Sequence, residues 1–236
     1  MAKNVTLDSR VDKAKKIRNR TSKGLTFLLA LGVFLFILTS SIAVPILWRG
    51  FYFSQAEKLQ ITEKTGYTDE QIRRAYHEML DYCIGISSEF SVGELEFSVE
   101  GADHFKDCRG LFLLDLWVLA ASTVFLLVWI LIRKTVHMRA CRLKGLGPAF
   151  WGSGALLALF GIIGGLGSID FDKTFTIFHK LFFPGKSNWI FDPRIDQVIR
   201  ILPEEFFMNC ALLIVSLILG QCVLFMGTEL ILKGRR

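Results

Sequence analysis

The chain has 236 residues, 52% of them hydrophobic and 21% charged, with a formal net charge of +6. This composition excludes a disordered chain and a collagen-like repeat, and five cysteines do not form the pattern of a secreted disulfide scaffold. A positive net charge also fits a nucleic-acid binder, so the positions of the charges matter. The apolar residues lie in four blocks, which is typical of a membrane protein.

Each of the four apolar blocks is long enough to cross a bilayer. A hydrocarbon core of ~30 Å needs about 20 apolar residues, because every backbone amide must be satisfied within the segment. None of the blocks contains Lys or Arg, and only Asp115 and Glu229 are acidic. We therefore expect an all-α polytopic membrane protein with four transmembrane helices. They cover residues 24–48, 111–132, 148–167 and 206–232.

The basic residues are distributed unevenly over the connecting segments. Segments 1–23, 133–147 and 233–236 hold 16 of the 28 Lys and Arg residues and two acids, a net charge of +14. Segments 49–110 and 168–205 hold the other 12 basic residues and 18 acids, a net charge of −6. The positive-inside rule predicts a cytoplasmic arm, loop and tail, with both termini inside and an extracellular cap in two parts. The partner of the basic arm is then membrane lipid, and no nucleic acid is expected.

The first cap segment predicts short elements. The aromatic run 51–53 is typical of a membrane interface. Thr68, followed by two acidic residues, predicts the N-terminus of a helix over 68–82. Alternating apolar and polar residues over 87–99 favour short strands or a small β-hairpin. From Gly101 the pattern is helical and continues into the second apolar block.

The second cap segment predicts an aromatic helix. His179 lies on its stripe, Pro184-Gly185 ends it, and a further short helix is expected over 195–202. Such a helix would lie along the membrane surface, with packing inside the cap as the alternative. The stripe consists of Phe171, Phe175, Phe178 and Phe182, spaced i, i+4, i+7 and i+11.

Two of the four histidines are candidates for chemistry. His137 lies in the basic loop and His77 on a helix surface, where a histidine usually has no special role. His104 and His179 fall at the depth of lipid head groups, where desolvation keeps an imidazole neutral and able to accept a proton. Two such groups can divide the roles of base and acid. No motif for zinc proteolysis, nucleotide use or serine hydrolysis is present.

Several alternatives stay open on the residues alone. Two histidines with an acid such as Asp107 could form a zinc site, and Cys83 and Cys108 could form a disulfide or stay free. The chain could be a non-catalytic lipid-binding or transporter-accessory membrane protein whose histidines sense pH. It could also be a phospholipid acyltransferase or lipase.

Two stretches resemble the bacterial lipoprotein intramolecular transacylases (Lit). The first is Asp103-His104-Phe105-Lys106-Asp107 at the head of the second apolar block; the second is FDKTFTIFHKLFFPGKSNWIFDP, followed by IDQVIRILPEEFF, between the third and fourth. The Cys108-Arg109 pair after Asp107 differs from the Val-Lys pair associated with the family. The resemblance implies a multi-pass enzyme of the bacterial cell membrane, with four transmembrane helices and an extracellular cap.

The resemblance also implies a reaction and a site at the interface of cap and membrane. The sn-2 acyl chain of a diacylglyceryl lipoprotein moves to the α-amino group of its own N-terminal Cys, giving the lyso form, without a metal or other cofactor. His104 and His179 map onto the catalytic histidines: one takes the amine proton and the other protonates the departing oxygen, in an order that the sequence leaves open. Asp107 orients an imidazole, holds the amine or has a structural role. The aromatic wall that folds the substrate consists of Phe178, Phe182, Phe183, Trp189, Phe206 and Phe207.

Overall fold

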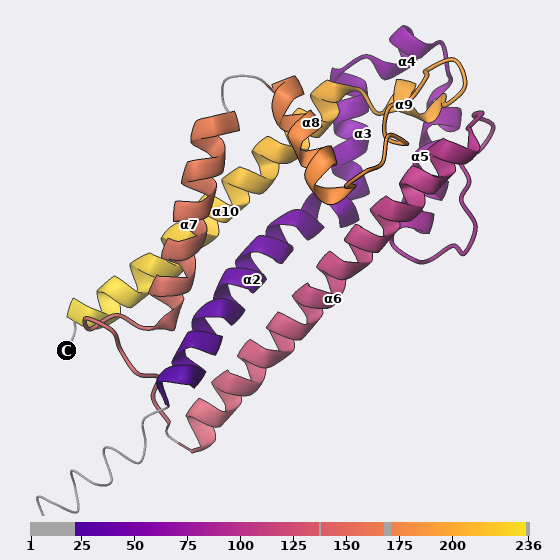
Figure 1. The fold of residues 1–236 in the computed structure, drawn as a ribbon. Coiled ribbons are helices and arrows are strands. Elements are labelled where there is room, and N and C mark those ends of the chain that lie inside the picture. The colour runs from indigo at the N-terminus through magenta and orange to yellow at the C-terminus, as the bar shows by residue number, and fades with distance from the viewer. Residues whose placement is uncertain (1–21, 137, 168–170, 235–236) are drawn as a thin grey trace, which may run out of the picture. The chain divides into compact units, whose positions relative to one another are not determined.

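The computed structural model describes residues 22–136, 138–167 and 171–234, without the side chains of 163–167 and 171. Most of the predicted basic arm, and His137, lie outside these residues. Every regular element in the described part is a helix, apart from an isolated bridge between Leu143 and Leu146 (Figure 1). The helices are α2 (Lys23–Leu47), α3 (Arg49–Lys58), α4 (Ile61–Thr65), α5 (Asp69–Cys83), α6 (Val99–Thr135), α7 (Pro148–Gly167), α8 (Phe171–Phe182), α9 (Val198–Ile201) and α10 (Glu204–Gly234).

Three helices, α2, α6 and α10, are long and apolar enough to cross a membrane, and they cover three of the four predicted spans. Helix α7 counts as a shorter apolar helix over its described stretch, Pro148–Ile162, so a fourth span remains a prediction. The 37 residues of α6 extend about 55 Å at ~1.5 Å per residue, well beyond a ~30 Å hydrocarbon core. Its charged first turns, residues 99–110, therefore lie outside the apolar stretch.

The chain divides into two compact units, each considered by itself. The first comprises residues 1–38, 119–158 and 219–236. In it α7 packs closely on α2, since a Cβ at Gly152 would collide with the carbonyl oxygen of Ala30.

Loop 139–147 of the first unit is fixed by an ion pair. Arg142 Nη2 lies 2.8 Å from Glu229 Oε2, which also accepts the backbone N–H of Gly147 at 3.3 Å. Both side chains of the pair are largely buried. Glu229, the acidic residue within the fourth apolar block, is therefore paired with Arg142 and with the backbone of Gly147.

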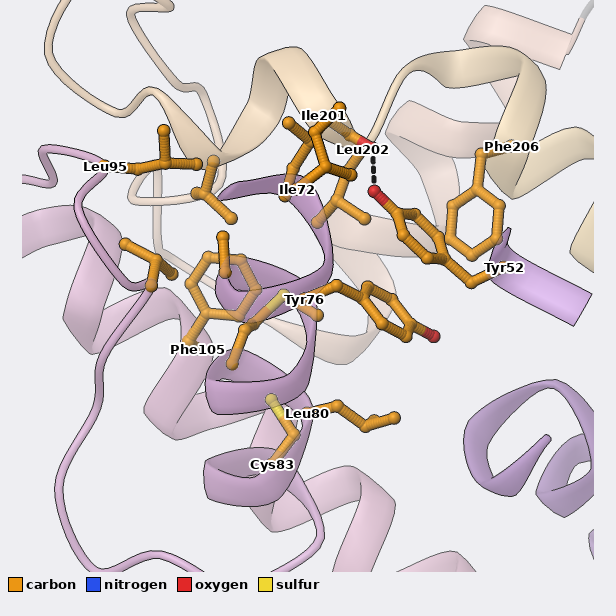
Figure 2. Packing of buried hydrophobic residues seen from close by; sticks show 14 of the residues in the cluster. Tyr52, Ile72, Tyr76, Leu80, Cys83, Leu95, Phe105, Ile201, Leu202 and Phe206 are labelled. Carbon is orange, nitrogen blue, oxygen red and sulfur yellow. Dashed lines mark hydrogen bonds between the residues drawn. The ribbon is translucent and has the colours of Figure 1, made fainter. Parts of the chain in front are cut away.

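The second unit, residues 39–118 and 159–218, has a core built around two tyrosines (Figure 2). Tyr52 and Tyr76 stack with ring centroids 3.6 Å apart, and the Tyr52 hydroxyl donates to the carbonyl oxygen of Ile201 at 2.9 Å. Tyr52 is only 1% exposed, so the prediction of an interfacial position is wrong for this residue. It lies on the short helix α3, which is followed by the short helix α4.

Helix α5 confirms the predicted helix over 68–82. Thr68 accepts the backbone N–H of Gln71, and the Gln71 side chain accepts that of Thr68, forming a capping box. The predicted strands over 87–99 do not form: the segment holds turns and bends up to the start of α6. Val92 and Leu95 are buried in the core, whereas Phe97 and Val99 are exposed, and no strand pairs with this segment among the described residues.

The start of α6 is held by the segment that precedes α9. Asp196 Oδ1 accepts both the backbone N–H and the hydroxyl of Ser98 at 2.8 Å, and the Ser98 hydroxyl oxygen accepts the N–H of Gly101 at 2.9 Å. Gly101 is needed here because a Cβ would collide with the buried Asp196 carboxylate. These bonds fix the first turns of α6 against residues distant in sequence. The short helix expected over 195–202 is limited to α9.

Candidate active site

The structure brings His104 and His179 together, although 75 positions separate them in the sequence. His104 lies on α6, one and a half turns after the Ser98 cap, and His179 lies near the end of α8. Their ring centroids are 5.8 Å apart, and the residues are 5% and 7% exposed. Gly185, with φ +74°, lies in the turn that follows α8, where the sequence predicts an end of the helix.

Aromatic rings surround both imidazoles. Phe183 contacts both rings, at centroid distances of 5.0 Å from His104 and 5.7 Å from His179. Trp189 stacks on His179 at 4.7 Å, and Phe178 lies 5.5 Å from the same ring. Three of the aromatic residues predicted for the substrate wall, Phe178, Phe183 and Trp189, therefore contact a histidine.

The other predicted wall residues lie farther out. Phe182 contacts Phe178 at 4.6 Å, and Phe207 contacts Phe175, which itself lies 4.1 Å from His179. Phe206 packs at 5.2 Å on Tyr52 of the core, because successive residues on a helix point about 100° apart. Phe206 is thus a core residue although Phe207, next to it, faces the site.

One aromatic neighbour of His104 was not singled out from the sequence. Phe191 lies 5.4 Å from the His104 ring and 5.9 Å from Phe105. It sits in the loop between α8 and α9, outside the i, i+4 pattern that identifies the other phenylalanines. Only the folded loop brings it to the site.

The hydrogen bonds of the two imidazoles differ. His179 Nδ1 lies 2.8 Å from the carbonyl oxygen of Phe175, which can only accept, so Nδ1 carries the proton and Nε2 keeps its lone pair. His104 Nε2 lies 3.4 Å from Cys108 Sγ. His104 Nδ1 is buried and has no hydrogen-bond partner among the described residues.

Burial keeps both imidazoles neutral. Desolvation, reinforced by the neighbouring His179, lowers the pKa of His104 from 6.5 to about 4, although Asp107 opposes the shift. Desolvation also lowers the pKa of His179, against the effect of its bond to Phe175. Both side chains are therefore in the uncharged form at neutral pH.

Asp107 lies at the edge of the site in an ion pair. Its two carboxylate oxygens lie 2.5 and 2.6 Å from Lys186 Nζ, and Asn188 Nδ2 donates to one of them at 3.2 Å. Burial alone would raise the pKa of Asp107, but the bonds from Lys186 and Asn188 outweigh it and hold the pKa below its usual value. The sequence predicts a role for Asp107 but does not identify its partners, Lys186 and Asn188, which follow the Pro184-Gly185 turn.

The zinc alternative finds no support in the described part of the chain. No three His, Cys, Asp or Glu side chains there are grouped so that they could hold a metal ion. The structure also answers the question left open for the cysteines: Cys83 and Cys108 are free thiols.

An open pocket of about 430 Å³ lies beside the histidine pair. Lys106, Asp107 and Lys186 line its polar part, and its apolar part includes Leu111 and two wall residues, Phe182 and Phe183. Phe183, which lines this pocket, also contacts both imidazoles.

Two neutral imidazoles in an aromatic enclosure can accept and donate protons at a bound molecule. On a chain whose helices are long enough to cross a bilayer, such a site is typical of a class of proteins, the integral membrane enzymes. The family follows from the sequence, because the family model described as lipoprotein intramolecular transacylase Lit matches residues 27–207. The chain belongs to this family and is an acyltransferase.

Solved structures agree with this assignment. The membrane-integral lipoprotein intramolecular transacylase Lit from Bacillus cereus is 25% identical, with a TM-score of 0.77, covering 89% of this chain and 94% of that chain. A variant of the same protein, with one histidine replaced by arginine, shows the same fold at 22% identity and a TM-score of 0.72, covering 99% of this chain and 97% of its own. No curated protein matches the chain.

Proposed function

We propose that the enzyme moves the sn-2 acyl chain of a diacylglyceryl lipoprotein onto the α-amino group of the lipoprotein's own N-terminal Cys. The bacterial relative is named for an intramolecular transacylation of lipoproteins. The product carries an amide-linked acyl chain and a free glyceryl hydroxyl, which is the lyso form. His104 and His179 are the catalytic residues of this proposal.

The reaction needs no nucleophile from the protein. The substrate amine attacks the ester carbonyl carbon, a C–N bond forms, and a cyclic intermediate of about eight atoms results, in which orientation supplies much of the rate. Collapse of the intermediate breaks the bond between the acyl carbon and the glyceryl oxygen. One proton leaves the amine and one proton reaches the departing oxygen, so the protein has only to relay protons and fold the substrate.

The observation that carries the proposal is the pair of buried imidazoles 5.8 Å apart. Both are neutral. The hydrogen bond to Phe175 uses Nδ1 of His179, so the lone pair on Nε2 can accept the amine proton. The aromatic rings around the pair limit the space in which the substrate can bend. This confinement favours the near-attack geometry that the cyclic intermediate requires.

The neighbouring pocket supports binding of a lipid substrate. Its polar part, with two lysines and Asp107, suits ester and glyceryl oxygens or the substrate amine, and its apolar part suits an acyl chain. The residues assigned to binding in this proposal are Asp107, Phe178, Phe182, Phe183, Trp189 and Phe207; Phe206 supports them from the core.

We also propose that the site faces the outside of a bacterial membrane. The charge distribution of the sequence supports this orientation, with a net charge of +14 on the arm, loop and tail and −6 on the two long segments. The helix α7 would supply the fourth span. A reporter fused to residue 236 should then be accessible only from the cytoplasm.

The test is tandem mass spectrometry of a reporter lipoprotein from cells with and without the protein. An intramolecular transfer leaves the total mass unchanged, so the fragment that holds the N-terminal Cys must gain an acyl chain while the glyceryl fragment loses one. A phospholipid acyltransferase or lipase that acts on free phospholipid would leave both lipoprotein fragments unchanged and would alter the masses of the phospholipids instead. Identical lipoprotein fragments and identical phospholipids in both cells would favour a non-catalytic lipid-binding or transporter-accessory protein.

A further inference from the structure

The two ring nitrogens of His104 have different surroundings. Nε2 faces the thiol of Cys108, one turn later on α6, at 3.4 Å from Sγ. Nδ1 is buried without a partner among the described residues, and the whole residue is 5% exposed. A neutral imidazole carries one proton, so the contact at Nε2 determines what Nδ1 can do.

The thiol is better suited to donate than to accept in this contact. Burial raises the pKa of Cys108, so the S–H bond stays intact at neutral pH, and a thioether or thiol sulfur is only a weak acceptor. The imidazole Nε2 lone pair is a good acceptor at this distance. When S–H donates to Nε2, the ring proton must lie on Nδ1.

We propose that Cys108 is a positioning residue that holds His104 in the tautomer with the proton on Nδ1. His104 then presents a hydrogen-bond donor to the site. His179, whose own Nδ1–H is bound to Phe175, presents the lone pair of Nε2. The tautomer itself does not depend on the substrate, whereas the roles below rest on the proposed function.

This assignment separates the roles of the histidines. His179 Nε2 takes the amine proton as the C–N bond forms, and the same proton passes to the glyceryl oxygen as the C–O bond breaks. The Nδ1–H of His104 stays on the ring and stabilises the negative charge that develops on the acyl oxygen, as a neutral imidazole donor can. In this assignment His179 both accepts the amine proton and donates it to the glyceryl oxygen. The roles of base and acid therefore fall on one histidine and are not divided between two.

The chain offers a matched control for Cys108. Cys83, a buried thiol on α5, contacts no histidine in the described contacts and serves as the matched control. Replacing either cysteine with valine removes a thiol at a similar side-chain volume.

The test is long-range ¹H–¹⁵N spectroscopy of the full chain in lipid nanodiscs, with ¹⁵N-labelled histidine. His104 signals are assigned by their loss in His104→Gln. We expect a protonated Nδ1 on His104 in the wild type, in Cys108→Ser and in Cys83→Val, and a shift of the proton toward Nε2 in Cys108→Val. The His179 signals should stay constant throughout. A wild-type His104 protonated at Nε2, or a tautomer unchanged in Cys108→Val, would overturn the proposal.

A kinetic measurement connects the tautomer to catalysis. Cys108→Val should lower kcat about 3- to 10-fold with little change in KM, since only the orientation of a donor is lost, and Cys108→Ser should restore most of it. A change confined to KM would contradict the positioning role. If the wild type has no activity on a lipoprotein while the spectra agree, the proposed function fails and the tautomer assignment stands.

Discussion

The second unit contains two aromatic clusters with different properties. In the core, Tyr52 and Tyr76 stack tightly, and the Tyr52 hydroxyl has its acceptor on Ile201 (Figure 2). At the histidine site, His104 Nδ1 and Asn188 Oδ1 are buried without partners among the described residues. An unsatisfied buried polar group costs ~1–3 kcal/mol, and such a cost persists where a bound molecule supplies the missing partner. The Tyr52 hydroxyl of the core thus has its partner, whereas the two unpaired atoms at the histidine site are available to a bound molecule.

The largest effect is expected from the histidines. His104→Gln and His179→Gln should each lower transacylation about 10²- to 10⁴-fold, because each removes a group that acts on the reacting atoms. Neither variant should unfold the protein, since glutamine fills much of the same space. Activity on a purified lipopeptide and thermal unfolding are measured together. His77→Gln is the control, because His77 contacts Arg49 on α3 and lies in no contact with either site histidine in the described structure. Retained activity in a site variant would contradict the assignment.

The core should respond in the opposite way. Ile201 is fully buried on α9, so Ile201→Ala should lower the free energy of unfolding by about 2–5 kcal/mol. Its carbonyl remains available to Tyr52, so the turnover of the folded fraction should stay near the wild-type value. Denaturation in mixed micelles and active-site-normalised rates provide the two measurements. A large loss of turnover in folded protein would remove the distinction between the two clusters.

Acid should destabilise the histidine site selectively. The folded pKa of His104, about 4, lies below its ordinary value of 6.5, so the unfolded chain takes up the proton first as the pH falls. Stability is therefore complete above pH 6.5 and declines toward pH 4, by ~3 kcal/mol from this residue. His179, whose pKa is also lowered, should add to the decline. Unfolding measured across this range should show a smaller slope in His104→Gln; an equal slope would indicate that other groups cause the decline.

The smallest effect is expected at the edge of the site. The Lys186–Asp107 pair is partly open to solvent, with side chains 48% and 23% exposed, so Lys186→Met should change stability by less than about 1 kcal/mol. A double-mutant cycle with Asp107→Asn measures the coupling of the pair. A coupling of several kcal/mol would instead show that the edge of the site stabilises the fold as the core does.

Much of the helical framework could be predicted from local patterns. A capping box fixes the start of α5 through residues three apart, and the turn at Pro184-Gly185 follows α8 for reasons local to the chain. The strands expected over 87–99 were wrong because alternation is a local pattern, whereas a strand also needs a partner, and the described part of the chain holds none for this segment. Tyr52 was misplaced for a similar reason: an aromatic run after an apolar block looks alike at an interface and in a core.

The sequence by itself determined the membrane character of the chain, the long apolar helices and the two histidines worth testing. These depend on composition, on length and on the identity of residues near one another in the chain. Only the tertiary structure brought His104 to His179, added Phe191, Lys186 and Asn188, and moved Phe206 into the core. It also left His104 Nδ1 unpaired among the described residues. Such features depend on distances across the fold, which no spacing along the chain determines.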